Sequence, residues 1–167
     1  MNDLKEKNER AFGDSFVEWL NSERGTRYRF IKRPDCAPDL LYSSNGNELF
    51  IEVTAAFYDS EHAKLIWKGV RGEADAPNRW IGVNPNKSLA AEIQNCLIKK
   101  AQKRYECKTL LLIEVPPGVT SAEELAELLE KQQFPKDLPF VGIYVVGNFP
   151  IKKDSSGGFR GIPIKKL

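Results

Sequence analysis

Apolar side chains recur with helical spacing in the first part of the chain, over residues 4–20. The stripe includes Phe12, Phe16, Trp19 and Leu20. Three short runs follow that are rich in β-branched and aromatic residues: RYRFIKRP, DLLYSS and ELFIEVTAAF. An Asn-Gly dipeptide separates the last two runs, and in this position it is a strong signal for a tight β-hairpin. The pattern predicts a helix followed by three antiparallel strands in a meander.

Helical patterns and fully apolar runs alternate in the second half of the chain. Ser88 is the expected N-cap of a helix that ends near Tyr105. The apolar stripe of this helix consists of Leu89, Ile93, Leu97 and Ala101. The runs TLLLIEV and VGIYVVGNF have the pattern of strands that are covered on both faces. Between them, a capping box in TSAEE predicts a helix that continues to about Lys131.

The order of these elements predicts one α/β domain over residues 1–167. We expect a mixed central sheet, in which an antiparallel meander is followed by a βαβ-like half, with helices flanking the sheet. A chain of 167 residues is long enough to bury such a three-layer core. Residues 150–167 form a basic tail, for which the sequence leaves two alternatives, a small hairpin or a flexible segment.

Composition and charge restrict the class of protein. With 41% hydrophobic and 29% charged residues the composition is that of an ordinary globular protein, and no apolar stretch has the length of a membrane span. The first residues, MNDLKEKNER, do not resemble a secretory signal, and three cysteines at no metal or disulfide spacing suit a reducing compartment. We therefore expect a cytoplasmic protein with no membrane partner. A net charge of +2 means that any site for a polyanion must be local.

Two carboxylates stand out among the predicted strands. Asp39 follows Pro38 at the head of the second strand, and Glu52 interrupts the apolar residues of the third. The hairpin between these strands brings both acids to the same end of the sheet. Such a pair suits a hard divalent ion, because Mg²⁺ takes one or two carboxylates together with water and phosphate oxygens.

A Pro-Asp pair, a hairpin and an acidic residue in a β-rich run resemble the metal-binding core of the PD-(D/E)XK nuclease superfamily. The resemblance implies a restriction-endonuclease-like fold, with Mg²⁺ or Mn²⁺ held by Asp39, Glu52 and the main-chain carbonyl of Val53. It also implies a contribution from a glutamate of the first helix. Glu9 lies on the apolar stripe of that helix, whereas Glu18 points away from it.

The sequence departs from the family pattern at Thr54, which replaces the lysine expected two residues after the second acid. Some members of the superfamily carry this lysine on a neighbouring helix. Lys100 lies on the inward stripe of the second predicted helix, with Lys99 and Lys103 to its sides. The resemblance therefore implies a catalytic role for Lys100, while Thr54 leaves catalysis open.

Each of these residues also has an ordinary structural interpretation. Aspartate after proline is a common turn residue. The carboxylate of Glu52 can be neutralised by an internal arginine or by backbone amides. Lys100 can extend its stem along the helix and place its ammonium group in water.

Residues 58–87 mix turn dipeptides, cations and aromatic rings without a sustained period. Five of them are candidate contacts to nucleic acid: Lys64, Trp67, Lys68, Arg71 and Arg79. Interleaved cations and aromatic rings neutralise phosphates and stack on bases, although a solvated face with core tryptophans has the same composition. No glycine-rich phosphate loop, Ser-His-Asp set or zinc spacing occurs in the sequence.

Two main hypotheses follow. The first is Mg²⁺-dependent hydrolysis of phosphodiester bonds in nucleic acid, with DNA favoured over RNA, by four residues: Asp39, Glu52, Glu9 and Lys100. The second is a catalytically inactive domain of the same fold that binds nucleic acid or a protein partner, for which Thr54 is the chief argument. A purely structural or inhibitory protein is a third alternative. The oligomeric state stays open, with a homodimer among the alternatives.

Overall fold

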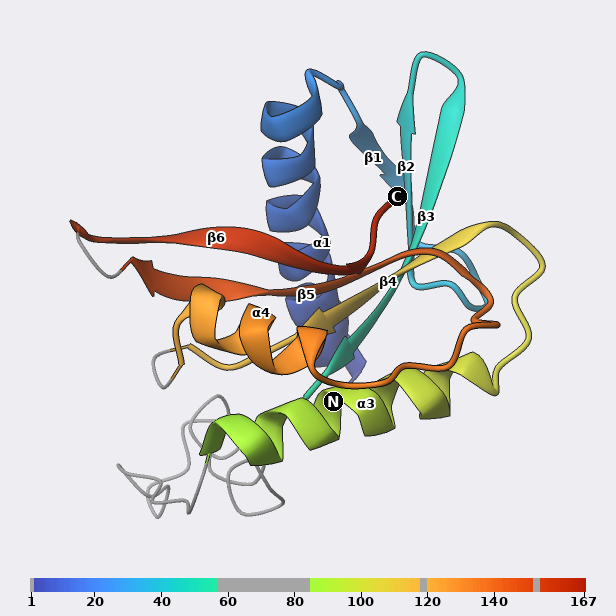
Figure 1. Cartoon of the computed structure of the whole chain (residues 1–167). Coiled ribbons are helices and arrows are strands. Elements are labelled where there is room, and N and C mark those ends of the chain that lie inside the picture. Colours follow the sequence, from blue (N-terminus) through green and yellow to red (C-terminus); the bar gives the residue numbers. More distant parts are fainter. Residues whose placement is uncertain (1, 57–84, 118–119, 152–153) are drawn as a thin grey trace.

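The computed structural model describes residues 2–56, 85–117, 120–151 and 154–167. These residues form one six-stranded sheet with helices on both faces (Figure 1). No helix in the described part of the chain is both long and apolar enough to cross a membrane. The expected α/β class with a mixed sheet is confirmed.

The strands follow one another across the sheet in chain order, from β1 at one edge to β6 at the other. Their bounds are β1 Arg29–Lys32, β2 Leu40–Ser44, β3 Asn47–Ala55, β4 Thr109–Glu114, β5 Phe140–Ile151 and β6 Asp154–Lys165. The pairs β1–β2, β2–β3 and β5–β6 are antiparallel, whereas β3–β4 and β4–β5 are parallel. The predicted antiparallel meander and the βαβ-like half are therefore both present.

The described helices cover the sheet from two sides (Figure 1). They are α1 (Asn2–Arg24) on one face, and α3 (Pro85–Ala101) and α4 (Ala122–Glu130) on the other. Alternate residues of β4 divide between the two cores: Leu110 and Leu112 face α1, whereas Leu111 and Ile113 face α3 and α4. The central strand is thus buried on both sides, which explains its continuous apolar run.

α1 packs closely against β2 at Gly13. A Cβ atom at this position would lie 2.3 Å from Leu40 Cδ1 and 2.7 Å from the Tyr42 hydroxyl oxygen, so glycine is required for this approach. The contact fixes α1 against the sheet and sets Glu9, one turn earlier, near the start of β2. α1 ends before Gly25, whose φ of 65° is typical of the residue that follows a helix.

The hairpin between β2 and β3 turns at the predicted Asn-Gly dipeptide, whose φ angles are 50° and 81°. Positive φ at both central positions matches the twist of the two strands, and this dipeptide adopts it at low cost. The register pairs Leu40 with Ile51. Asp39 and Glu52 flank this pair, so the hairpin brings the two acids to the same end of the sheet, as predicted.

α3 begins and ends earlier than the sequence indicated. It starts at Pro85 rather than at a Ser88 cap, because proline is well tolerated in the first turn of a helix. It ends at Ala101 rather than near Tyr105. Tyr105 leaves the helical path and packs against Phe140, with the two ring centroids 5.3 Å apart. Both predicted ends of this helix are therefore wrong.

Two features of the last third of the chain support the sheet. The Ser121 hydroxyl accepts a hydrogen bond of 3.2 Å from the Glu124 main-chain N–H, which is the predicted N-cap of α4. Residues 154–165 of the basic tail form β6, which pairs with β5 in a long hairpin. Most of the tail is thus a single strand paired with β5, rather than a small hairpin of its own.

Candidate active site

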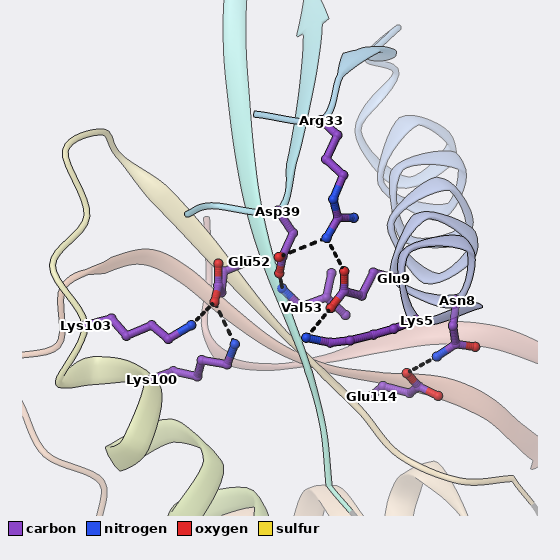
Figure 2. Close-up of polar contacts among 10 residues, drawn as sticks. All are labelled: Lys5, Asn8, Glu9, Arg33, Asp39, Glu52, Val53, Lys100, Lys103 and Glu114. Carbon is purple, nitrogen blue, oxygen red and sulfur yellow. Dashed lines mark hydrogen bonds and ion pairs between the residues drawn. The ribbon is translucent and has the colours of Figure 1, made fainter. Parts of the chain in front are cut away.

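The residues that the sequence singled out lie around one stretch of β3 (Figure 2). They are Glu9, Asp39, Glu52 and Lys100. β3 pairs with β2 only as far as Ile51, while residues 52–55 continue their pairing with β4. The helix α1 lies over one face of this stretch and α3 over the other, so side chains from both layers reach the same end of β3.

Glu9 is connected to Asp39 through an arginine that the sequence analysis did not identify. Arg33 Nη2 lies 2.5 Å from Glu9 Oε2 and 3.5 Å from Asp39 Oδ1. Lys5 Nζ lies 3.4 Å from the other oxygen of Glu9, whose side chain is only 7% exposed. The two cations offset the cost of burying this carboxylate. Glu9 thus reaches Asp39 through Arg33.

Asp39 is fixed by the main chain of β3. Its Oδ2 atom accepts a hydrogen bond of 2.9 Å from the Val53 N–H. Burial raises the pKa of Asp39 above its usual range; the charges of Glu52 and Glu9 raise it too, whereas the Val53 N–H and the Lys100 charge lower it. Burial is the main cause, so the ionised form of Asp39 is costly unless a cation or a donor compensates it. The N–H and C=O of one strand residue point to the same side, so the Val53 carbonyl also faces the Asp39 side of β3.

Glu52 lies on the α3 side of β3 and is almost completely buried, with 1% of its side chain exposed. Its Oε1 atom accepts hydrogen bonds from Lys100 Nζ at 2.6 Å and from Lys103 Nζ at 3.2 Å (Figure 2). Its Oε2 atom is buried and has no hydrogen-bond partner among the described residues. A carboxylate oxygen in this state is costly unless a cation or a donor approaches it.

These groups fit a hydrated divalent ion held by few protein ligands. Within the described residues no cluster of three or more His, Cys, Asp or Glu side chains has the arrangement of a metal site. Two carboxylates and one carbonyl are nonetheless enough for Mg²⁺, which keeps several waters. Asp39, Glu52 and the Val53 carbonyl are the candidate ligands, and the unpartnered oxygen of Glu52 is the observation that favours them.

A small cavity of about 110 Å³ lies beside Glu9, at the end of β3. It is lined by Lys5, Asn8, Glu9, Val53, Thr54, Ala55, Lys100 and Glu114. The cavity lies where the parallel strands β3 and β4 end, and in open α/β sheets ligands bind beyond the carboxyl ends of strands. Thr54 lines it, at the position where the family resemblance predicts a lysine, and Lys100 is also among its lining residues.

Glu114 is a second carboxyl in this cavity. Its Oε2 atom accepts a hydrogen bond of 3.0 Å from the Asn8 side-chain amide (Figure 2). Burial raises the pKa of Glu114 to about 7; the Asn8 hydrogen bond opposes this rise, and the charge of Glu9 adds to it. Glu114 therefore exchanges its proton near neutral pH.

The raised pKa of Glu114 predicts a pH-dependent stability. In the unfolded chain the pKa returns to about 4.5, so the contribution of Glu114 to stability is complete below pH 4.5 and is lost as the pH rises through about 7. Glu114→Gln removes this titration. Between pH 5 and 8 the unfolding free energy of the wild type should fall by about 2 kcal/mol relative to Glu114→Gln in denaturant titrations. The control is Glu130→Gln, which replaces an exposed carboxyl. The prediction is contradicted if the difference in unfolding free energy between the wild type and Glu114→Gln stays constant from pH 5 to 8 and equals that found for the control.

Arg33, Glu114 and Lys103 are among the residues that the sequence analysis did not assign to the site, each for an identifiable reason. Arg33 lies in the connection between β1 and β2, where no strand or helix periodicity indicates which way a side chain points. Glu114 ends an apolar run, as Glu52 interrupts one, and this shared signal could have identified it. Lys103 was expected to point sideways, but it contacts Glu52 because the helix has already ended.

The candidate nucleic-acid contacts in residues 58–87 are not placed by the structure. Lys64, Trp67, Lys68, Arg71 and Arg79 lie outside the described residues.

In comparisons with known proteins, no family model matches the chain, and no curated protein or solved structure matches it. The function is therefore argued from the geometry of the site.

Proposed function

We propose that this chain is a metal-dependent nuclease-like protein with a restriction-endonuclease-like fold that hydrolyses phosphodiester bonds in nucleic acid, DNA in preference to RNA. The main support is the buried carboxylate of Glu52, which combines an unpartnered oxygen with a 2.6 Å contact to Lys100. Asp39 lies at the same end of the hairpin, and the charge of Glu52 raises the pKa of Asp39. A helix, an antiparallel meander and a crossover helix frame these acids, in the order that the family resemblance implies.

Asp39, Glu52 and the Val53 carbonyl would hold Mg²⁺ or Mn²⁺. Such an ion would supply a Lewis acid for the phosphate and lower the pKa of a bound water. The charges of Glu52 and Glu9 also raise the pKa of Asp39, and a cation at this position would offset them. Glu9 assists indirectly, because it holds Arg33 and thereby orients Asp39.

Lys100 would stabilise the negative charge that develops on the non-bridging phosphate oxygens, or it would orient the attacking water. Its side chain is 17% exposed, so it acts in a partly dry environment where electrostatic effects are strong. Preorganised groups of this kind contribute roughly 10²- to 10³-fold in rate. In this proposal Lys100 replaces the lysine that the family carries at the position of Thr54.

The segment 58–87 would supply further contacts to the substrate. Its cations and aromatic rings suit a surface that follows a nucleic-acid backbone and stacks on bases. The five candidates are Lys64, Trp67, Lys68, Arg71 and Arg79. The segment joins β3 to α3, and both of these elements carry residues of the proposed site.

A specific observation favours the alternative of an inactive domain that binds nucleic acid or a protein partner. Internal cations already lie against the acids: Arg33 against Glu9 and Asp39, and two lysines against Glu52. A site neutralised in this way has less need of a metal ion. Cleavage of DNA or RNA in the presence and absence of divalent metal separates the two functions.

A further inference from the structure

Two lysines share one oxygen of Glu52. Lys100 Nζ and Lys103 Nζ lie 2.6 and 3.2 Å from Glu52 Oε1. One carboxylate can neutralise only one of these ammonium groups, so at Glu52 itself the lysines outnumber the carboxylate by one. An excess cation beside a proposed phosphate site is available to an anionic ligand.

The two lysines differ in their access to solvent. The Lys100 side chain is 17% exposed and makes the shorter contact, whereas the Lys103 side chain is 51% exposed. Lys100 also lines the cavity beside Thr54. Lys103 is therefore the cation that a ligand approaching from solvent meets first, and its longer contact with Glu52 is more easily exchanged than that of Lys100.

The main chain that carries Lys103 is held in place. The Lys103 N–H donates to the Lys100 carbonyl at 3.1 Å, and the Tyr105 hydroxyl donates to the same carbonyl at 3.2 Å. The Tyr105 ring packs against Phe140 of β5. The turn after α3 is thus anchored to the sheet, so Lys103 projects from a fixed base beside Glu52.

We propose that Lys103 binds a backbone phosphate next to the one that reacts beside Lys100, so that the substrate is a polynucleotide and not an isolated phosphodiester. This inference rests on the proposed function, because it takes the reacting phosphate to lie at Glu52 and Lys100. Lys103 exchanges its contact with Glu52 for the flanking phosphate, while Lys100 stays in the cavity. A single diester has no second phosphate to occupy this position.

The test uses Lys103→Met, with Lys99→Met as the matched control because Lys99 is an exposed lysine in the last turn of α3, just before Lys103. Affinity for a labelled single-stranded oligonucleotide is measured by fluorescence anisotropy in EDTA over a series of salt concentrations. Lys103→Met should weaken binding about tenfold and reduce the slope of log K against log salt by about one, as expected for one lost phosphate contact. Lys99→Met should change neither quantity, and Lys103→Arg should restore both.

Kinetics then locate the contact. The ratio of kcat/KM for the oligonucleotide to kcat/KM for bis(p-nitrophenyl) phosphate should fall about tenfold in Lys103→Met. Equal losses for both substrates, an unchanged salt slope, or the same slope change in Lys99→Met would overturn the assignment. If the wild type cleaves neither substrate but Lys103→Met still lowers the salt slope, the hydrolytic function fails while the phosphate contact stands. If the wild type binds no oligonucleotide, the contact itself is refuted.

Discussion

Lys100→Met should lower Mg²⁺-dependent phosphodiesterase activity by roughly 10²- to 10³-fold, through kcat more than through KM. The methionine keeps the aliphatic stem and removes the charge that lies 2.6 Å from Glu52. Initial rates of cleavage of a labelled oligonucleotide measure the effect. Lys99→Met on the same helix should retain wild-type activity, and equal activity of Lys100→Met would refute the catalytic role of Lys100.

The same substitution should also destabilise the protein, which the sequence alone did not indicate. If the ammonium group of Lys100 lay in water, as its ordinary interpretation has it, the loss of its charge would leave folding nearly unchanged. The structure instead pairs Lys100 with a carboxylate that is 1% exposed. Breaking such a pair costs about 3–5 kcal/mol when no partner remains, and the effect should be smaller here because Lys103 still contacts Glu52. Activity must therefore be compared at a temperature where both proteins are folded.

Asp39→Ala should abolish the binding of Mn²⁺ that calorimetry is expected to show for the wild type. The substitution removes one of only two carboxylates available to the ion, and Mg²⁺ or Mn²⁺ held by a single carboxylate binds weakly. Asp35→Ala is the matched control, because Asp35 is an exposed acid in the same connection between β1 and β2. Equal Mn²⁺ binding by Asp39→Ala and wild type would place the metal elsewhere.

The placement of the two acids could be predicted from local signals. An Asn-Gly turn fixes the register of two neighbouring strands, and the register alone decides which residues meet at the far end. Asp39 and Glu52 were therefore located without knowledge of any distant contact. Lys100 was located by helical periodicity, which holds because α3 continues through residue 101.

The same periodicity failed for Lys103, and the reason is physical. An angle of 100° per residue applies only while the helix lasts, and α3 ends at Ala101. The chain then turns, and the Lys103 N–H donates a hydrogen bond to the Lys100 carbonyl. As a result, the Lys103 side chain points toward Glu52. Beyond this turn Tyr105 packs against Phe140 of β5, a contact between residues far apart in the sequence that helical periodicity does not predict.

The counter-ions of the site could not be predicted from local patterns. Arg33 lies in an irregular connection, and its contact with Glu9 depends on how α1 is placed over β2. That placement depends in turn on the close approach at Gly13. The ordinary interpretation of Glu52 named an internal arginine or backbone amides as its partners, and this was wrong, because two lysines contact the carboxylate instead.

The most direct test of the proposed function is cleavage of labelled single- and double-stranded DNA and RNA by the purified protein with Mg²⁺ or Mn²⁺. We expect cleavage with metal, no cleavage in EDTA, and no cleavage by Asp39→Ala under the same conditions. Cleavage that persists in EDTA or in Asp39→Ala would show that hydrolysis does not depend on this site. If no substrate is cleaved with either metal while the wild type still binds nucleic acid, the protein is the inactive binding domain instead.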